Sequence, residues 1–260
     1  MVITIKNEAE IAAMRRAGRV VADILEILEA SIRPGMKTSE LNDIAERELA
    51  ARGARSSFKG YHGYPASLCV SINDQVVHGI PGTRTIESGD IVSLDFGAIV
   101  DDYNGDAALT VAVGEVGLQA KRLIQTTTEA LSAGIAAARA GGRLGDISAA
   151  IQRHAESRGF GVVREYTGHG IGRAMHEEPL VPNFGHAGEG LQLKPGMTLA
   201  LEPMLTAGDW RTRLGADGWV VTTADHSLAA HFEHTIAITN GKAEVLTARE
   251  PKTAAEESAL

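Results

Sequence analysis

The feature that most constrains this chain is an internal repeat, in which two segments of similar pattern follow each other along the sequence. The segment RPGMKTSELNDIAERELAARG, starting at Arg33, resembles RAGGRLGDISAAIQRHAESRG, starting at Arg139, at an offset of 106 residues. Likewise GDIVSLD, ending at Asp95, resembles GMTLALE, ending at Glu202. A repeat on this scale requires two halves with the same order of elements, and it limits the fold more than composition does.

Each half combines helical periodicity with a following pair of strands. Apolar residues recur at helical spacing in NEAEIAAMRRAGRVVADILEILEASI, and TSELNDIAERELAARG predicts a second helix opened by a Thr or Ser cap. From about Gly89 the pattern changes to strands around an acidic turn at Asp101 and Asp102. We therefore predict an α+β fold, with the helices of two halves, about 5–117 and 118–248, on one face of a mainly antiparallel sheet.

The repeat superposes four carboxylates, Asp95 on Glu202 and Asp106 on Glu233. The offset is 107 for the first pair and 127 for the second, so the second hairpin carries 20 additional residues. A turn centred between Asp101 and Asp102 makes Asp106 the diagonal neighbour of Asp95, at an α-carbon separation of about 7–8 Å. A pseudo-twofold axis would bring all four acids together.

Four acids in an apolar surrounding indicate a metal site. Buried carboxylates are costly unless they are paired or bound to a cation, and the sequence offers no obvious arginine or lysine partners. The segment TGHGIGRAMHEEP supplies His169 and His176 as candidate nitrogen donors. Oxygen ligands with one imidazole favour Mn, Fe, Co or Zn, and four carboxylates suit two divalent ions about 3.5–4 Å apart.

The motifs YHGYP, VSIND, VVHGIP, GHGIGRAMHEEP, LEPM and FEHT, in this order, resemble the type I methionine aminopeptidases, which have the creatinase-like or pita-bread fold. The similarity runs from near residue 5 to about residue 248. The resemblance implies a dinuclear centre with five ligands: Asp95, Asp106, His169, Glu202 and Glu233. Glu177 and Glu178 of the same loop are left off this ligand set.

The resemblance also implies an activity, the removal of the N-terminal methionine from nascent proteins whose second residue is small. An ion-bound hydroxide would attack the first peptide bond, with Glu202 as the proton shuttle. His176 would hydrogen-bond the scissile amide, and His78 would help to bind the reacting peptide. The implied apolar pocket for the methionine side chain is lined or bordered by Tyr61, His62, Tyr64, Cys69 and Trp219.

Two positions depart from the usual family pattern. Phe58 stands where a small cysteine is common, and Met175 stands where phenylalanine often precedes HEEP. Both changes leave the predicted ligands intact but alter the expected shape of the pocket.

Other readings use the same fold. An X-Pro dipeptidase or aminopeptidase P would share the ligands, but these enzymes usually carry an additional N-terminal domain, and only 94 residues precede Asp95. A type II methionine aminopeptidase would need a helical insert, for which the 26 residues from His176 to Glu202 leave no room. A binding protein of this fold would have lost its ligands, whereas all five positions are filled here.

Composition and charge bear on the setting. The net charge of −8, without a basic stripe, argues against a nucleic-acid partner, and no apolar run is long enough for a membrane helix. The lone cysteine, Cys69, and the absence of a signal-like start favour the cytoplasm. We expect one metallopeptidase domain over 1–250, a flexible tail at 251–260, and a monomer acting on nascent chains at the ribosome.

Overall fold

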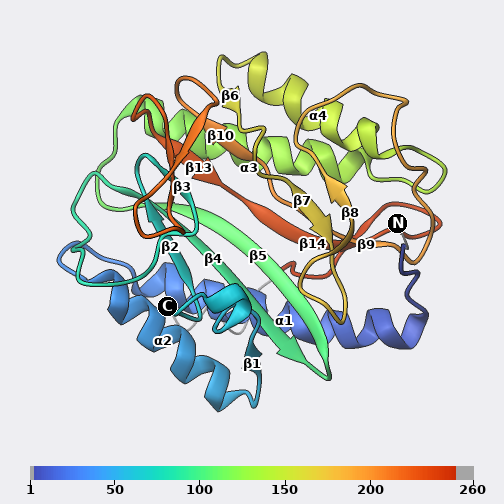
Figure 1. The fold of residues 1–260 in the computed structure, drawn as a ribbon, viewed down its shortest axis with the longest axis horizontal. Coiled ribbons are helices and arrows are strands. Elements are labelled where there is room, and N and C mark those ends of the chain that lie inside the picture. The colour runs from blue at the N-terminus through green and yellow to red at the C-terminus, as the bar shows by residue number, and fades with distance from the viewer. Residues whose placement is uncertain (1–2, 250–260) are drawn as a thin grey trace, which may run out of the picture.

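The computed structural model describes residues 3–249, and helices cover a mainly antiparallel sheet (Figure 1). The expected tail at 251–260 lies outside the described residues. The helices are α1 (Glu8–Ser31), α2 (Thr38–Ala51), α3 (Leu118–Ala137) and α4 (Leu144–Glu156), with a 3-10 turn, η1 (Tyr61–Gly63). The strands are β1 (Arg55–Ser56), β2 (Cys69–Ile72), β3 (Gln75–Val77), β4 (Ile91–Val100), β5 (Tyr103–Ala112), β6 (Gly161–Val162), β7 (Gly168–Gly170), β8 (Glu177–Val181), β9 (Thr198–Leu201), β10 (Met204–Thr206), β11 (Thr212–Leu214), β12 (Val221–Thr223), β13 (Ala229–His231), β14 (Glu233–Ala237) and β15 (Glu244–Val245).

The main sheet is built around the two repeated hairpins. Its strand order is β1-β4-β5-β14-β9-β7-β8, with β2 also paired to β4 and β15 to β14. The hairpin β4–β5 of the first half therefore meets its counterpart, β14 and β9, at the β5–β14 pair. Every strand pair among residues 3–249 is antiparallel. The expected α+β fold is confirmed.

The register of the first hairpin is the predicted one. Asp95 pairs with Ala108, which makes Asp106 its diagonal neighbour. The tight turn consists of Asp101 and Asp102, both with positive φ, as a two-residue hairpin turn of the right twist requires.

The helices of the two halves begin in the same way. In α2 the Glu40 carboxylate accepts the backbone N–H of Lys37 at 2.6 Å, and in α4 Asp146 accepts that of Arg143 at 2.8 Å. These two pairs are related by the repeat offset. The expected Thr or Ser cap is wrong, because Thr38 is already helical and its hydroxyl instead bonds the backbone of the loop at Gly82.

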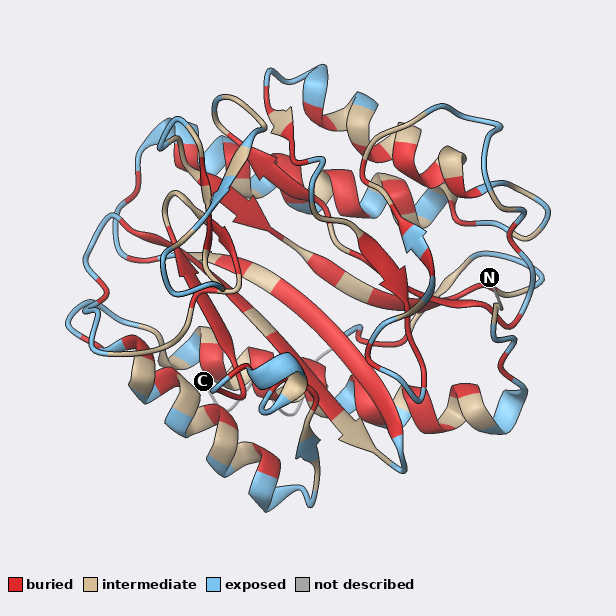
Figure 2. Cartoon of the chain, viewed as in Figure 1, coloured by how far each residue is buried: buried red, intermediate tan, exposed pale blue. Residues whose placement is uncertain are grey.

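The helices cover one face of the sheet and leave the other for the site. Helix α1 packs on β4 and β5, while α3 packs on β9 and β14, and each contacts its partner helix α2 or α4. Leu94 and Phe96 are fully buried in the core beneath α1 and α2. Since side chains alternate along a strand, Asp95 between them must face away from those helices. Figure 2 shows that the strands are mostly buried, whereas the helices are exposed along their outer sides.

Candidate metal centre

The five predicted ligands come from five strands or strand ends of the main sheet. Asp95 lies on β4, Asp106 on β5, His169 on β7 and Glu233 at the start of β14, while Glu202 directly follows β9. In the second half His234 pairs with Leu201, so Glu202 and Glu233 stand opposite each other just beyond that pair. The two halves thus direct their acids to one place.

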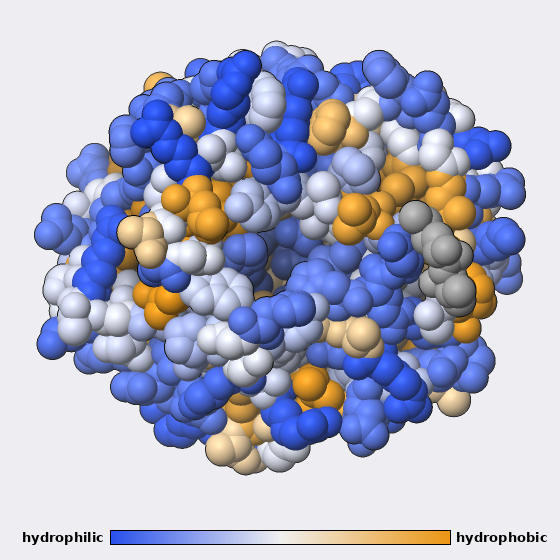
Figure 3. Space-filling model, in the orientation of Figure 1, coloured by the Kyte–Doolittle hydropathy of each residue, from blue (hydrophilic) through white to orange (hydrophobic). Residues whose placement is uncertain are grey.

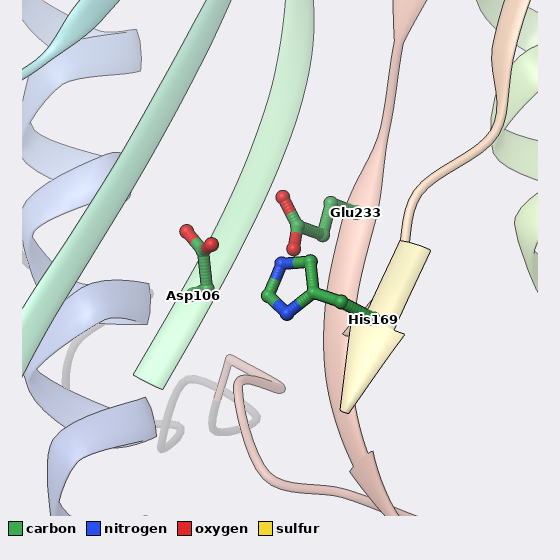
Figure 4. A group of neighbouring side chains, drawn as sticks. All are labelled: Asp106, His169 and Glu233. Carbon is green, nitrogen blue, oxygen red and sulfur yellow. The ribbon is translucent and has the colours of Figure 1, made fainter. Parts of the chain in front are cut away.

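Three of these side chains converge most closely. Asp106, His169 and Glu233 are buried, and each offers one ligand atom such that all three atoms lie within 4.8 Å of one another. Figure 4 shows the carboxylates and the imidazole pointing toward a common space. A histidine with two carboxylates is a suitable donor set for a borderline divalent ion.

His169 is oriented as a ligand. Its Nδ1 lies 2.8 Å from the carbonyl oxygen of Gly170, so a proton on Nδ1 leaves the Nε2 lone pair free. That Nε2 lies 3.6 Å from Oε1 of Glu202. The flanking glycines allow the close approach of this strand, because a Cβ on Gly168 would collide with the backbone oxygen of Ala200.

Buried carboxylate oxygens without hydrogen-bond partners indicate a cation at this position. Oδ1 of Asp95, Oδ1 of Asp106 and Oε1 of Glu233 are buried and have no hydrogen-bond partner among the described residues. The cavity lining includes no lysine or arginine from that part of the chain. Buried carboxylate oxygens without donors carry a large desolvation cost, which a divalent ion would offset. The donor set therefore fits a metal ion.

The pKa values of these groups reflect burial together with mutual repulsion. Burial raises the pKa of Asp95 to about 7. Burial first, and then the neighbouring acids, raise the pKa values of Asp106, Glu202 and Glu233 well above their ordinary range. Burial lowers the pKa of His169 to about 3, so its imidazole is neutral at neutral pH. Without a counter-charge the acids hold protons that a divalent cation would displace.

His176 and His78 lie at the same centre. The imidazole rings of His169 and His176 have centroids 4.1 Å apart. Nδ1 of His176 lies 2.8 Å from the hydroxyl of Tyr61, and the two rings are stacked. Burial lowers the pKa of His78 to about 4 and also lowers that of His176, so both are neutral near pH 7.

One cavity of about 230 Å³ brings these groups together with an apolar wall. Figure 3 shows the hollow near the centre of the face that it displays. All twelve residues singled out from the sequence line this cavity, as do both departures from the family pattern. The lining residues are Phe58, Tyr61, His62, Tyr64, Cys69, His78, Asp95, Asp106, His169, Met175, His176, Glu202, Trp219 and Glu233.

The apolar wall is a packed cluster. Phe58, Tyr64, Cys69 and Met175 are buried together, and Trp219 packs against them. The Tyr64 hydroxyl donates to the carbonyl oxygen of Gly79 at 3.0 Å, so its ring is fixed in place. Phe58 and Met175, which stand where cysteine and phenylalanine are usual, therefore belong to the same cluster and line the same cavity.

Glu177, which follows His176, has a structural partner. Its carboxylate lies 2.5 Å from Nζ of Lys6, whose side chain is 3% exposed. This ion pair fixes the loop to the N-terminal segment and explains why Glu177 is not among the cavity residues.

The sequence patterns were not used to predict one buried histidine beside the acids, His231. Nε2 of His231 lies 4.0 Å from Oε2 of Glu202 and 4.0 Å from Oε2 of Glu233. The signal was available in HFEH, because residues two apart on an extended strand point to the same side. His231 therefore had to share the face of Glu233.

Comparisons with known proteins identify similar chains of similar length. The family model described as Metallopeptidase family M24 matches residues 12–240. A methionine aminopeptidase of Clostridium perfringens is 48% identical over 245 residues, covering 94% of this chain and 98% of that protein. The crystal structure of methionine aminopeptidase from Thermotoga maritima superposes with a TM-score of 0.94 at 44% identity, covering 95% of this chain and all of that one (100%).

A more distant match belongs to the alternative class of enzyme, the X-Pro dipeptidases. The Xaa-Pro dipeptidase from Bacillus anthracis superposes with a TM-score of 0.74 at 27% identity, and the match covers 96% of this chain but 63% of that one. The fold is shared, whereas length and sequence agree better with the first two proteins.

Proposed function

The chain belongs to metallopeptidase family M24, among its methionine aminopeptidases, and on that premise we propose that its cavity releases the N-terminal methionine of nascent polypeptides whose second residue is small. One observation carries the proposal for this site. The same cavity is lined by five residues that can donate to metal ions, by two neutral histidines and by an apolar wall. Such a cavity combines hydrolytic groups with room for one unbranched apolar side chain.

We assign Asp95, Asp106, His169, Glu202 and Glu233 as ligands of two divalent ions. Co, Mn, Fe and Zn all suit these donors. Bound there, the ions would polarise the scissile carbonyl and lower the pKa of a coordinated water. The three orphaned carboxylate oxygens support this assignment.

The histidines act on the peptide. If the Tyr61 hydroxyl donates to Nδ1 of His176, the imidazole carries its proton on Nε2, where it can donate to the scissile amide. His78, which is partly buried and neutral near pH 7, lines the cavity beside Trp219 and helps to hold the substrate backbone. Fixed donors of this kind stabilise negative charge as it develops on the carbonyl oxygen.

Glu202 moves the proton. Its carboxylate lines the cavity, where it can accept a proton from water. The same group then donates to the leaving amine, as general acid–base catalysis requires.

The apolar wall selects the side chain. Tyr64, Cys69 and Trp219, with Tyr61 and His62 at the border, surround a space suited to a thioether chain. Sulfur packs favourably beside aromatic edges, and Tyr64 and Trp219 present an edge-on pair with centroids 5.0 Å apart. Phe58 and Met175 set the remaining width.

The cellular setting is part of the proposal. No helix within residues 3–249 has the length and apolarity to cross a membrane. We place the enzyme in the cytoplasm as a monomer that acts on chains emerging from the ribosome, without contacting nucleic acid. Residues 1–250 would form the single catalytic domain.

A substrate comparison tests the function. The protein is stripped with a chelator, refilled with Mn, Fe, Co or Zn, and offered Met-Ala-Ser or an X-Pro peptide. We expect methionine release from the first peptide only after refilling. Preference for the X-Pro peptide would contradict the substrate assignment, and full activity after chelation would contradict the role of the metal.

A further inference from the structure

His231 has no partner, although it is almost completely buried. Its side chain is 2% exposed, and neither Nδ1 nor Nε2 has a hydrogen-bond partner among the described residues. A buried imidazole without partners costs about 1–3 kcal/mol. This cost requires an explanation, and the groups around the ring provide one.

The backbone fixes the position of this ring. His231 ends β13, and its N–H donates to Oγ1 of Thr110 at 2.9 Å. The Thr110 hydroxyl in turn donates to the His231 carbonyl oxygen at 2.9 Å. Both backbone groups are thus anchored to β5, the strand that carries Asp106. The histidine is therefore held in register with the acids.

The ring lies between two acids that come from different strands. Nε2 is equally far, 4.0 Å, from Oε2 of Glu202 and Oε2 of Glu233. This separation is about 1 Å longer than a hydrogen bond, so a small shift of either carboxylate closes it. A binding ion would draw the two carboxylates to defined positions.

A direct bond from His231 to the ions is less consistent with its location. The five assigned ligands all line the cavity, whereas His231 does not. Both ring nitrogens are buried, and Nε2 lies near the carboxylates of Glu202 and Glu233.

We propose that His231 is a positioning residue that donates its Nε2–H to the carboxylates of Glu202 and Glu233 and so holds them in the geometry that binds the metal ions. This inference rests on the proposed function only in taking these two acids as ligands. Partners that orient ligands in this way typically contribute about 10–100-fold to metal affinity.

The experiment compares His231→Leu with His231→Gln in the full-length protein. Both are stripped of metal and titrated with Mn²⁺ by calorimetry, without substrate. Leucine removes the donor, and we expect affinity to fall by about 10–100-fold. Glutamine retains an N–H donor of similar reach, and we expect affinity within about threefold of the wild type.

His234→Leu is the matched control. His234 is partly buried and, one residue after Glu233, lies on the other side of the strand, where its Nδ1 lies 2.9 Å from Oγ1 of Thr247. We expect this variant to keep wild-type Mn²⁺ affinity while its melting temperature falls. In contrast, His231→Leu should keep or raise the melting temperature of the metal-free protein, because it removes buried polar atoms that lack partners.

Two results would overturn the proposal. One is wild-type Mn²⁺ affinity in folded His231→Leu, and the other is an equal loss in the leucine and glutamine variants, which would make the imidazole itself a ligand. If the leucine variant does not fold, His231→Asn, whose amide is too short to reach, must show the loss instead. Peptide hydrolysis plays no part in the titration, so a wild-type protein that binds Mn²⁺ but releases no methionine contradicts the proposed function alone.

Discussion

The two repeated halves deliver the same pair of acids through different connections. In the first half, β4 and β5 are joined by the two-residue turn at Asp101 and Asp102, and their acids are diagonal neighbours. In the second half, β9 and β14 are separated by the strands β10 to β13, and Glu202 and Glu233 stand directly opposite each other. The repeat thus supplies the four carboxylate ligands, whereas His169 on β7 and the inserted segment have no counterpart in the first half.

The inserted segment of the second half adds side chains to the cavity and its surroundings, whereas the tight turn of the first half adds none. It carries Trp219 to the apolar wall, and it returns through β13 with His231 beside the glutamates. Its strand β12 also pairs with β3, the strand that precedes His78. The charge at this centre therefore comes from both halves, whereas the shape of the cavity depends on segments that are not repeated.

The largest expected effect tests the equivalence of the two halves. Asp106→Asn and Glu233→Gln each remove one buried carboxylate from a central strand. We expect each to lower kcat/KM for Met-Ala-Ser by about 10³-fold or more, because each weakens metal binding and several kcal/mol of transition-state stabilisation depend on the metal. The measurement is methionine release, together with Mn²⁺ titration. A large loss of activity in one variant and none in the other would contradict the equivalence of the two halves.

The next effect separates ligands from groups that act on the substrate. His176→Ala removes the imidazole that contacts Tyr61 and His169. We expect kcat to fall by about 10²-fold, as is typical when a positioned proton donor is lost, with Mn²⁺ affinity unchanged. Steady-state kinetics and calorimetry on the same preparation measure both quantities. A parallel fall in Mn²⁺ affinity would place His176 among the ligands.

A smaller effect concerns the apolar wall, to which each half contributes. Phe58→Ala, in the first half, opens the wall where the family commonly has a small side chain. We expect kcat/KM for the methionine peptide to fall by about 10-fold and that for a bulkier first residue to rise, since apolar pockets discriminate by about 1–3 kcal/mol. Trp219→Ala provides the comparison from the inserted segment. Unchanged selectivity in both variants would contradict the assigned wall.

The smallest effect, expressed per pH unit, is a pH dependence of stability in the metal-free protein. Burial raises the pKa of Asp95 to about 7, whereas an unfolded aspartate titrates near about 3.9. Between these values the folded state binds more protons, so the free energy of unfolding falls as pH rises, by about 1 kcal/mol per pH unit. Stability from the raised pKa is fully present below about pH 4 and is lost above about pH 7.

Urea unfolding between pH 5 and pH 7 measures this slope. Saturating Mn²⁺ should flatten or reverse it, because the ion displaces the protons and binds only the folded state. The same slope with and without Mn²⁺ would show that the acids do not share one electrostatic centre with the ion.

The periodic parts of this molecule were predictable from sequence. The register of Asp95 with Ala108 follows from one turn and the two-residue period of strands, and both are local properties. The equivalence of α2 and α4 follows from the repeat. Their first turns are capped by the acids Glu40 and Asp146 rather than by Thr38 or Ser39, because both of the latter lie inside the helix and the Thr38 hydroxyl bonds the backbone of Gly82.

The remaining features depend on contacts between distant segments. The HFEH pattern places His231 on the face of Glu233, but its approach to Glu202 depends on the pairing of β13 with β10 and on the bonds to Thr110 of β5, which no local pattern specifies. Likewise, the pairing of Lys6 with Glu177 joins residues far apart in the chain. The motifs predicted which side chains form the site. That these side chains line one cavity could be seen only in the three-dimensional structure.

The most direct test of the central claim is the metal content of the enzyme measured together with its activity. The chelated protein is titrated with Mn²⁺ while bound metal and methionine release from Met-Ala-Ser are followed on the same samples. We predict that activity is absent at zero occupancy, rises with bound Mn²⁺, and is lost in Asp106→Asn and Glu233→Gln alike. Full methionine release from protein that holds no bound metal would contradict the account.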